Sequence, residues 1–197
     1  MSLSKHELFQ QMLEQINLHH QPEYLPYFEN GEIEQVIVHK KSKLWSFQFV
    51  FDNVLPFEVF TALMNHMKIK FQSIATIDFQ IKTRKPILTN ESILDYWETV
   101  VQRSNISSPL VLSLFAKHTP VVLDNKVVIS VENEITKNHL ADNYLSIIQQ
   151  NYLVLGFPSF QITIEVDEAA SEARMAQYLA RKQEQDEMLV KQAEEAI

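Results

Sequence analysis

The side chains of this chain that could contact a charged partner are two short clusters of lysine and arginine. Lys40, Lys41 and Lys43 fall in one short polar run, and Arg84 and Lys85 form a second group. Cationic side chains of this kind attract phosphate groups or acidic protein surfaces. The simpler interpretation is a solvated turn whose charges keep a sheet edge from aggregating. If the basic side chains do have a binding role, these five residues are the candidate contacts for a partner or for phosphate.

Motifs for catalysis and cofactor binding are missing from the sequence. The chain has no Cys, which removes disulfides, thiolate nucleophiles and Cys-ligated zinc. Its two glycines, Gly31 and Gly156, stand far apart, whereas phosphate cradles and nucleophile elbows need closely spaced glycines. No Asp-x-Asp or Asp-x-Glu occurs, although two-metal phosphoryl transfer commonly uses such a pair. We expect no catalytic residue, no cofactor and no metal ion in this chain.

The histidines offer few metal ligands. His139 and Asp142 are three positions apart and could share one helix face. A hydrogen-bonding pair on the surface is the simpler interpretation, because no His-Glu-x-x-His motif and no Cys accompanies them. His19 and His20 are adjacent in a predicted loop, and His66 is expected on the solvent side of a helix.

The composition is that of a folded, acidic protein. The chain has 197 residues, of which 46% are hydrophobic and 21% charged, and its net charge is −8. Residues 1–85 carry nine Lys/Arg and nine Asp/Glu, whereas residues 86–166 and residues 167–197 each carry four and eight. Such an acidic second half would repel a nucleic-acid backbone. Because the N-terminus lacks a signal-peptide core and no window is apolar enough for a membrane span, we expect a cytoplasmic protein with no membrane partner.

The first half of the chain is predicted to form a helix, a hairpin, a second helix and a closing strand. Ser4 and Glu7 have capping-box spacing, and a strand at residues 33–39 follows after a loop. Pro56 suits the first turn of the second helix. The apolar stripe of the first helix consists of Leu8, Met12, Leu13 and Ile16, and the inward residues of the closing strand are Ile77, Phe79 and Ile81.

An aromatic stripe marks the second strand of this hairpin. Trp45, Phe47, Phe49 and Phe51 occupy alternate positions, so they share one face. A stacking platform for nucleic-acid bases would need such rings exposed. Since an apolar helix of similar size follows, we expect the four side chains in the core instead.

The order of hairpin, helix and strand returns at residues 119–166. Asn90 is expected to cap a helix containing Ile93, Leu94, Trp97 and Val101. Ser108 and Pro109 open another helix, and a hairpin turns at residues 124–126. One long helix is then predicted from residue 132, with Gly156 as its left-handed cap. Its expected buried residues are Ile135, Leu140, Tyr144, Ile147, Ile148 and Leu153.

The predicted fold class is α+β, with two small modules that each contain a β-hairpin, a helix and a closing strand. The expected divisions are a first domain at residues 1–84, a second at residues 85–167, and a charged helical linker at residues 168–197. The linker has a weak apolar stripe of Met175, Leu179, Leu189 and Ala193. It stops within its own pattern, as expected of a linker that continues toward another domain.

Two long stretches of the chain resemble a known family. PYFENGEIEQVIVHKKSKLWSFQFVFDNVLPFEVFT (residues 26–61) is similar to the first domain of the PolC-type DNA polymerase III alpha subunit of Gram-positive bacteria. KVVISVENEITKNHLADNYLSIIQQNYLVLGFP (residues 126–158) is similar to its second N-terminal domain. The full-length family member is a DNA-directed DNA polymerase with a proofreading exonuclease. Those portions, and an oligonucleotide-binding domain, lie beyond the matched region, so no catalytic residue of the family carries over.

The second module also resembles the KH-like adaptor folds of the bacterial replication initiator and of the clamp loader tau subunit. KH domains that bind nucleic acid clamp its backbone with a Gly-x-x-Gly loop, and this sequence has none. The resemblance therefore implies a non-catalytic docking region of a replicative polymerase, whose expected partner is a replisome protein, the clamp loader tau subunit. The alternative is an accessory nucleic-acid-binding module that holds template near the polymerase through the five basic residues.

Overall fold

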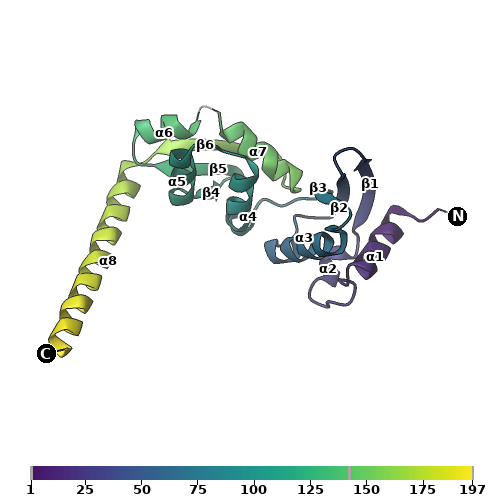
Figure 1. Cartoon of the computed structure of the whole chain (residues 1–197). Coiled ribbons are helices and arrows are strands. Elements are labelled where there is room, and N and C mark those ends of the chain that lie inside the picture. The colour runs from purple at the N-terminus through teal and green to yellow at the C-terminus, as the bar shows by residue number, and fades with distance from the viewer. Residues whose placement is uncertain (1, 142, 197) are drawn as a thin grey trace.

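Two three-stranded sheets with helices packed on them make up the fold. The computed structural model describes residues 2–141 and 143–196. Figure 1 shows one sheet in the N-terminal half and the other in the second half, with α8 (Glu168–Glu195) extending away from the second sheet. The α+β class expected from the sequence is confirmed, and the order of elements is compatible with the expected KH-like arrangement.

The first module begins with a capped helix. The Ser4 hydroxyl accepts a hydrogen bond from the Glu7 backbone N–H at 3.1 Å, as its spacing predicted. Pro56 immediately precedes the second long helix, where its missing N–H removes no helical hydrogen bond. The elements are α1 (Lys5–Gln15), α2 (Leu25–Phe28), β1 (Glu32–His39), β2 (Leu44–Phe51), α3 (Phe57–Phe71) and β3 (Thr76–Thr83).

The second module adds two helices before its sheet. Thr89 caps the first of them, with its hydroxyl 3.1 Å from the Ser92 backbone N–H. The predicted cap, Asn90, instead accepts the Val122 backbone N–H through its side-chain oxygen. The elements are α4 (Asn90–Arg103), α5 (Pro109–Lys117), β4 (Pro120–Leu123), β5 (Lys126–Val131), α6 (Glu134–Ala141), α7 (Leu145–Val154) and β6 (Gln161–Val166).

The two sheets share one topology, so the predicted repeat of hairpin, helix and strand is confirmed. β1 pairs antiparallel with β2, and β3 pairs parallel with β2. Likewise β4 pairs antiparallel with β5, and β6 pairs parallel with β5. A parallel pair needs a crossover connection, which α3 supplies in the first module and α6 with α7 in the second. In the β4–β5 turn Asp124 and Asn125 both have positive φ, as a two-residue type I′ turn requires.

The single long helix predicted from residue 132 is wrong. α6 and α7 are separate helices, and residue 142 between them lies outside the described residues. Leu140 and Ile148 are buried as expected, but Ile135 and Ile147 are 70% and 43% exposed and Leu153 is exposed as well. An apolar pattern over such a stretch fits several helical phases, so it does not reveal where one helix stops and another begins. Gly156 does follow α7 with φ of 93°, as predicted for a left-handed cap.

Two predicted core positions lie at the surface. Leu8 of α1 is 41% exposed, and the buried position beside it is Phe9. Leu94 of α4 is 39% exposed, although Ile93 and Trp97 are buried as predicted. The buried stripe of α1 is therefore rotated by one residue relative to the stripe inferred from the sequence. The buried stripe of α4 excludes one residue that the sequence pattern included.

The buried core is continuous between the two modules. The Tyr96 hydroxyl of α4 donates to the Leu55 carbonyl just before α3 at 2.8 Å. Ile81 of β3 forms a parallel β-bridge with Leu155, which follows α7. The predicted domain division near residue 85 remains a prediction, but the segments on either side of it share packed side chains.

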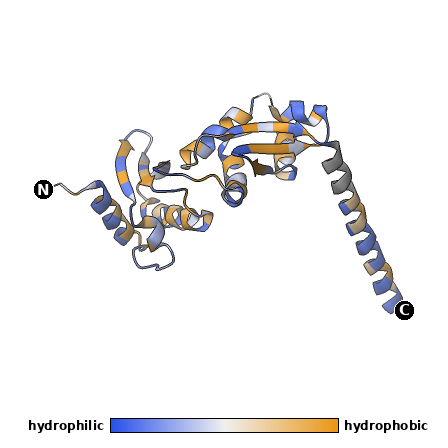
Figure 2. Ribbon diagram, turned by 180° about the vertical axis from the view of Figure 1, so that it is seen from behind, coloured by the Kyte–Doolittle hydropathy of each residue, from blue (hydrophilic) through white to orange (hydrophobic). Residues whose placement is uncertain are grey.

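The helix α8 has few apolar side chains to bury. Its described side chains, residues 176–196, are exposed, and Figure 2 shows mostly hydrophilic colouring along them. A helix that is polar on most of its surface suits a bridge through solvent. No helix within the described residues is both long and apolar enough to span a membrane.

Candidate functional site

The lysine turn, which we define as Lys40, Lys41 and Lys43, joins β1 to β2. All three side chains are exposed, and Lys43 adopts a positive φ of 51° that lets the chain reverse. The Lys43 carbonyl accepts the Thr76 backbone N–H at 2.8 Å, which ties the turn to the start of β3. Within the described residues no ion pair involves these lysines, so the turn presents three uncompensated positive charges to solvent.

Arg84 lies in a network of polar groups at the opposite end of the first sheet. Its guanidinium donates to the Asp52 carboxylate at 2.9 Å and to the Asn30 carbonyl at 2.9 Å, and it lies 3.2 Å from Glu32. The Asn30 amide also donates to Asp52 at 2.7 Å. These hydrogen bonds, with that from Asn30 the larger cause, lower the pKa of the Asp52 carboxyl. The guanidinium of Arg84 is therefore already paired with carboxylates of the protein itself.

The two basic groups predicted as one contact set lie far apart. Leu44 pairs with Thr76 beside the lysine turn, and Phe51 pairs with Thr83 beside Arg84. The eight residues of β2 separate these two ends, which corresponds to roughly 23 Å at about 3.3 Å per residue. Lys85 is exposed beside Arg84, with its backbone N–H 2.8 Å from the Asp52 carbonyl. The structure therefore brings Arg84 and Lys85 together but leaves the lysine turn separate.

The aromatic stripe is core rather than a stacking platform. Phe47, Phe49 and Phe51 are 5%, 0% and 1% exposed, as predicted, and Trp45 is half-buried against Phe71. Rings in this position cannot stack on nucleic-acid bases without unfolding the sheet. The face that would have carried the nucleic-acid alternative is thus covered by α1 and α3.

The histidines do not assemble a metal site in the part of the chain that is described, where no three His, Asp or Glu side chains converge. His19 and His20 contact each other at the surface. His66 is half-buried rather than solvent-facing, because its ring nitrogen lies 2.8 Å from the Ile16 carbonyl. His139 is exposed, and its predicted partner Asp142 lies outside the described residues.

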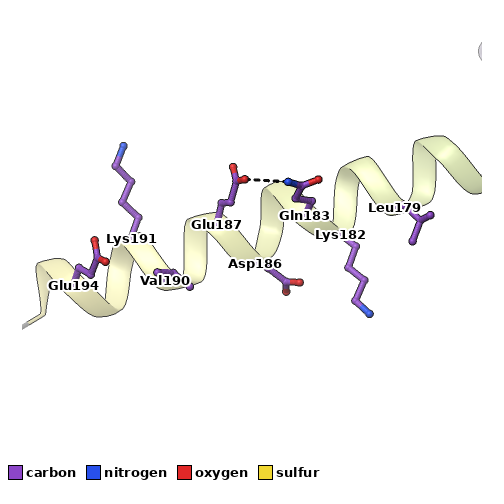
Figure 3. Close-up of a pocket in the computed structure, with 8 residues that line it drawn as sticks. All are labelled: Leu179, Lys182, Gln183, Asp186, Glu187, Val190, Lys191 and Glu194. Carbon is purple, nitrogen blue, oxygen red and sulfur yellow. Dashed lines mark hydrogen bonds between the residues drawn. The ribbon is translucent and has the colours of Figure 1, made fainter.

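A shallow hollow runs along the surface of α8. Figure 3 shows its lining side chains pointing to different sides of this one helix, with Lys182 and Asp186 on one side and Lys191 and Glu187 on the other. Gln183 and Glu187 approach each other at 3.4 Å. Since no second element faces these side chains in Figure 3, the hollow does not enclose a ligand.

The partners of Arg84 were not identified from the sequence. Asp52 lies 32 positions before Arg84 and Asn30 lies 54 positions before it. No local spacing in the sequence connects these residues to Arg84. The antiparallel register of β1 and β2 brings their ends together. A sheet register would have been needed to find this network.

Comparisons with known proteins give one consistent result. A family model described as DNA polymerase III polC-type N-terminus I matches residues 8–81, and one described as N-terminus II matches residues 95–197. A protein named DNA polymerase III PolC-type from Latilactobacillus sakei is 44% identical over 87% of this chain. Proteins of the same name from Pediococcus pentosaceus and Bacillus subtilis are 35% and 30% identical over 100% and 94% of it.

The chain spans only a small part of these relatives, namely 12%, 13% and 13% of their lengths. No solved structure shows significant similarity to it.

Proposed function

Because the chain belongs to the PolC-type DNA polymerase III family, we propose that it is a non-catalytic docking region of a replicative polymerase. It would hold the polymerase to other replisome proteins in the cytoplasm. The polymerase and proofreading exonuclease activities belong, in this proposal, to parts of the protein outside this chain. No cofactor is proposed for the chain itself.

The separation of the basic residues carries the proposal. A groove for a nucleic-acid backbone needs a continuous row of cations. Here the lysine turn lies at one end of β2, and Arg84 is engaged by Asp52 and Glu32 at the other. The buried aromatic stripe and the acidic second half also favour a protein partner.

The partner that the family resemblance favours is the clamp loader tau subunit. The lysine turn is suited to steering an acidic surface of such a partner, because opposite charges at the exposed rim of an interface raise the association rate more than they slow dissociation. The turn sits on a hairpin whose register is fixed by β2 and β3. The partner would therefore meet the three lysine charges of the turn in a defined position.

Binding kinetics with purified tau subunit test this proposal. The triple variant Lys40→Glu, Lys41→Glu and Lys43→Glu should slow association about tenfold or more at low salt, with a smaller change in dissociation. The matched control reverses the exposed residues Lys68, Lys70 and Lys126 instead, which changes the net charge equally. Equal effects of the two triple variants, or no binding of tau at all, would count against the proposal.

The second candidate function is an accessory nucleic-acid-binding module. The observation in its favour is that three exposed lysines at one turn carry no ion pair within the described residues. Titration with single-stranded DNA at several salt concentrations separates the two functions. Micromolar binding at physiological salt that the lysine-turn variant abolishes would establish this second function.

A further inference from the structure

A groove between α4 and α5 lies on the second module, away from the basic residues. It has a volume of about 380 Å³ and is lined mainly by Leu94, Trp97, Glu98, Val101, Leu112 and Phe115. Trp97 and Phe115 form its floor, with their ring centroids 5.6 Å apart in an edge-to-face arrangement. Both are buried, and the Trp97 indole N–H already donates to the Phe115 carbonyl at 2.9 Å. The floor is therefore apolar and has no indole donor left to satisfy.

Two partly exposed leucines line this groove, one from each helix. Leu94 comes from α4 and is 39% exposed, and Leu112 comes from α5 and is 37% exposed. The sequence pattern placed Leu94 in the core, but the structure leaves it partly exposed to solvent. A helix pair with an apolar floor and a partly exposed leucine on each helix is the geometry that receives the apolar face of a third helix.

The rim of the groove on α4 is acidic. Glu98 is exposed and lines the groove. Glu91 and Asp95 are exposed on the same side of the helix, seven and three positions before Glu98, where they line a neighbouring hollow beside Pro56 and Phe57. Among the described residues none of the three takes part in an ion pair. Lys117 at the end of α5 is directed to Glu132 at 3.7 Å. The apolar groove thus has the unpaired carboxylate of Glu98 in its lining, with Glu91 and Asp95 farther along the same helix.

We propose that this groove binds an amphipathic helix of a partner protein, one with an apolar stripe flanked by Lys or Arg. The apolar stripe would cover Leu94 and Leu112, and the basic flank would pair with Glu98. The helix α8 of a second copy is a poor occupant, since residues 167–197 carry eight acidic and four basic residues. The proposal goes beyond the docking function above, because it concerns another surface and does not depend on the tau subunit.

The test uses the fluorescence of Trp97 in the full chain. Of the two Trp residues, Trp45 is replaced in a Trp45→Phe background, so that the remaining emission reports on the groove floor. The probe is a peptide of about 18 residues made of Leu and Lys, with Leu at i, i+3, i+4 and i+7. Its controls are a scrambled peptide of the same composition and the same pattern with Glu in place of Lys.

The expected result is a saturable change in Trp97 emission with the amphipathic basic peptide alone. Leu112→Asn and, separately, Leu94→Asn should each weaken its binding at least tenfold. Leu110→Asn is the matched control, because Leu110 is also exposed on α5 but does not line the groove, and it should leave the affinity unchanged. Because these three leucines are exposed by more than a third, the variants should keep the circular dichroism and melting temperature of the parent.

Several outcomes would overturn the proposal. Equal binding of the scrambled peptide, or equal loss with Leu110→Asn, would show unspecific adsorption. The absence of a saturable signal would show that the groove takes no such helix. A concentration-dependent dimer in sedimentation that Leu112→Asn abolishes would assign the groove to a second copy instead.

Discussion

The Tyr96 hydroxyl donates a hydrogen bond to the Leu55 backbone carbonyl at 2.8 Å, and both residues are buried. The bond joins α4 of the second module to the segment that precedes α3 of the first. The rings of Phe57, Phe60 and Phe157 surround Tyr96 with centroids 5.0, 5.3 and 5.1 Å away. If one partner of a hydrogen bond in such an apolar setting is removed, the remaining polar group stays buried without a partner, and the protein loses the desolvation free energy of that group.

Tyr96→Phe should therefore lower the free energy of unfolding by about 1–2 kcal/mol, because the Leu55 carbonyl loses its partner while the ring packing stays. Denaturation by urea measures the change. Tyr178→Phe is the matched control, since Tyr178 of α8 is 62% exposed, and its effect should stay within about 0.5 kcal/mol. If both variants unfold alike, the bond contributes nothing to stability.

Stability at high pH should depend on the same hydroxyl. Burial, with a smaller contribution from the Asp95 carboxylate, raises the pKa of Tyr96 above its ordinary value, and burial also raises the pKa of Tyr152. In the unfolded chain both phenols ionise near pH 10. The stabilisation that the two neutral, buried phenols give to the folded state is therefore fully present below about pH 10. It is lost as the pH rises toward their raised pKa in the folded protein.

The measurement is the difference in unfolding free energy between the parent and Tyr96→Phe at several pH values. This difference should shrink above about pH 10 by about 1.4 kcal/mol per pH unit, since only the parent has this phenol to ionise when unfolded. Contributions of groups that both proteins share cancel in this difference. A difference that stays constant up to pH 11.5 would mean that the Tyr96 pKa is not raised in the folded state.

The sequence predicted elements well where residues alternate along a strand, and it predicted some helix caps, although the cap of α4 is Thr89 and not Asn90. The aromatic stripe of β2, the Ser4 cap and the positive φ at Gly156 were all found where expected. It failed at the division between α6 and α7, because the apolar residues there fit more than one helical phase. It also failed for the site: Arg84 and the lysine turn have similar local composition, and only the register of β2 with β3 shows that they lie at opposite ends.

The aromatic stripe should dominate the stability of the first module. Phe49 is 0% exposed and its ring lies 6.0 Å from Phe9, 5.9 Å from Phe47 and 5.9 Å from Phe51. Phe49→Ala should cost about 3–5 kcal/mol of unfolding free energy. Val38→Ala, at a position of β1 that is 49% exposed, should cost far less in the same urea titration. A loss below about 1 kcal/mol for Phe49→Ala would show an accessible aromatic face and revive base stacking.

Fragments 1–85 and 86–197 test the predicted division of the chain. Each fragment keeps a complete sheet with its crossover helix, so each should show a cooperative thermal melt. Each should also melt at a lower temperature than the full chain, because the cut removes the contacts of Tyr96 with Phe57 and Phe60 and exposes these rings to water. A fragment without a cooperative transition would show that the two halves form one folding unit.

Gly156 should be the residue on the second module least tolerant of a methyl group. Its φ of 93° is strained for any L side chain, and a Cβ there would lie 2.8 Å from the Thr83 Cγ2 and 3.0 Å from the Ile81 Cγ2 of β3. The Thr83 hydroxyl also donates to the Gly156 carbonyl. Gly156→Ala should therefore lower the free energy of unfolding by about 2–4 kcal/mol, through backbone strain and overpacking together.

A double-mutant cycle with Thr83→Ser separates these two causes for Gly156. Serine keeps the hydroxyl that donates to the Gly156 carbonyl but lacks the Cγ2 that the new methyl group would strike. The double variant should thus be more stable than the sum of the single losses predicts, by about 0.5–2 kcal/mol. Urea denaturation of the four proteins gives this coupling energy. Strict additivity would mean that Thr83 does not press against this position, which would leave the positive φ and the contact with Ile81 as the reasons for glycine.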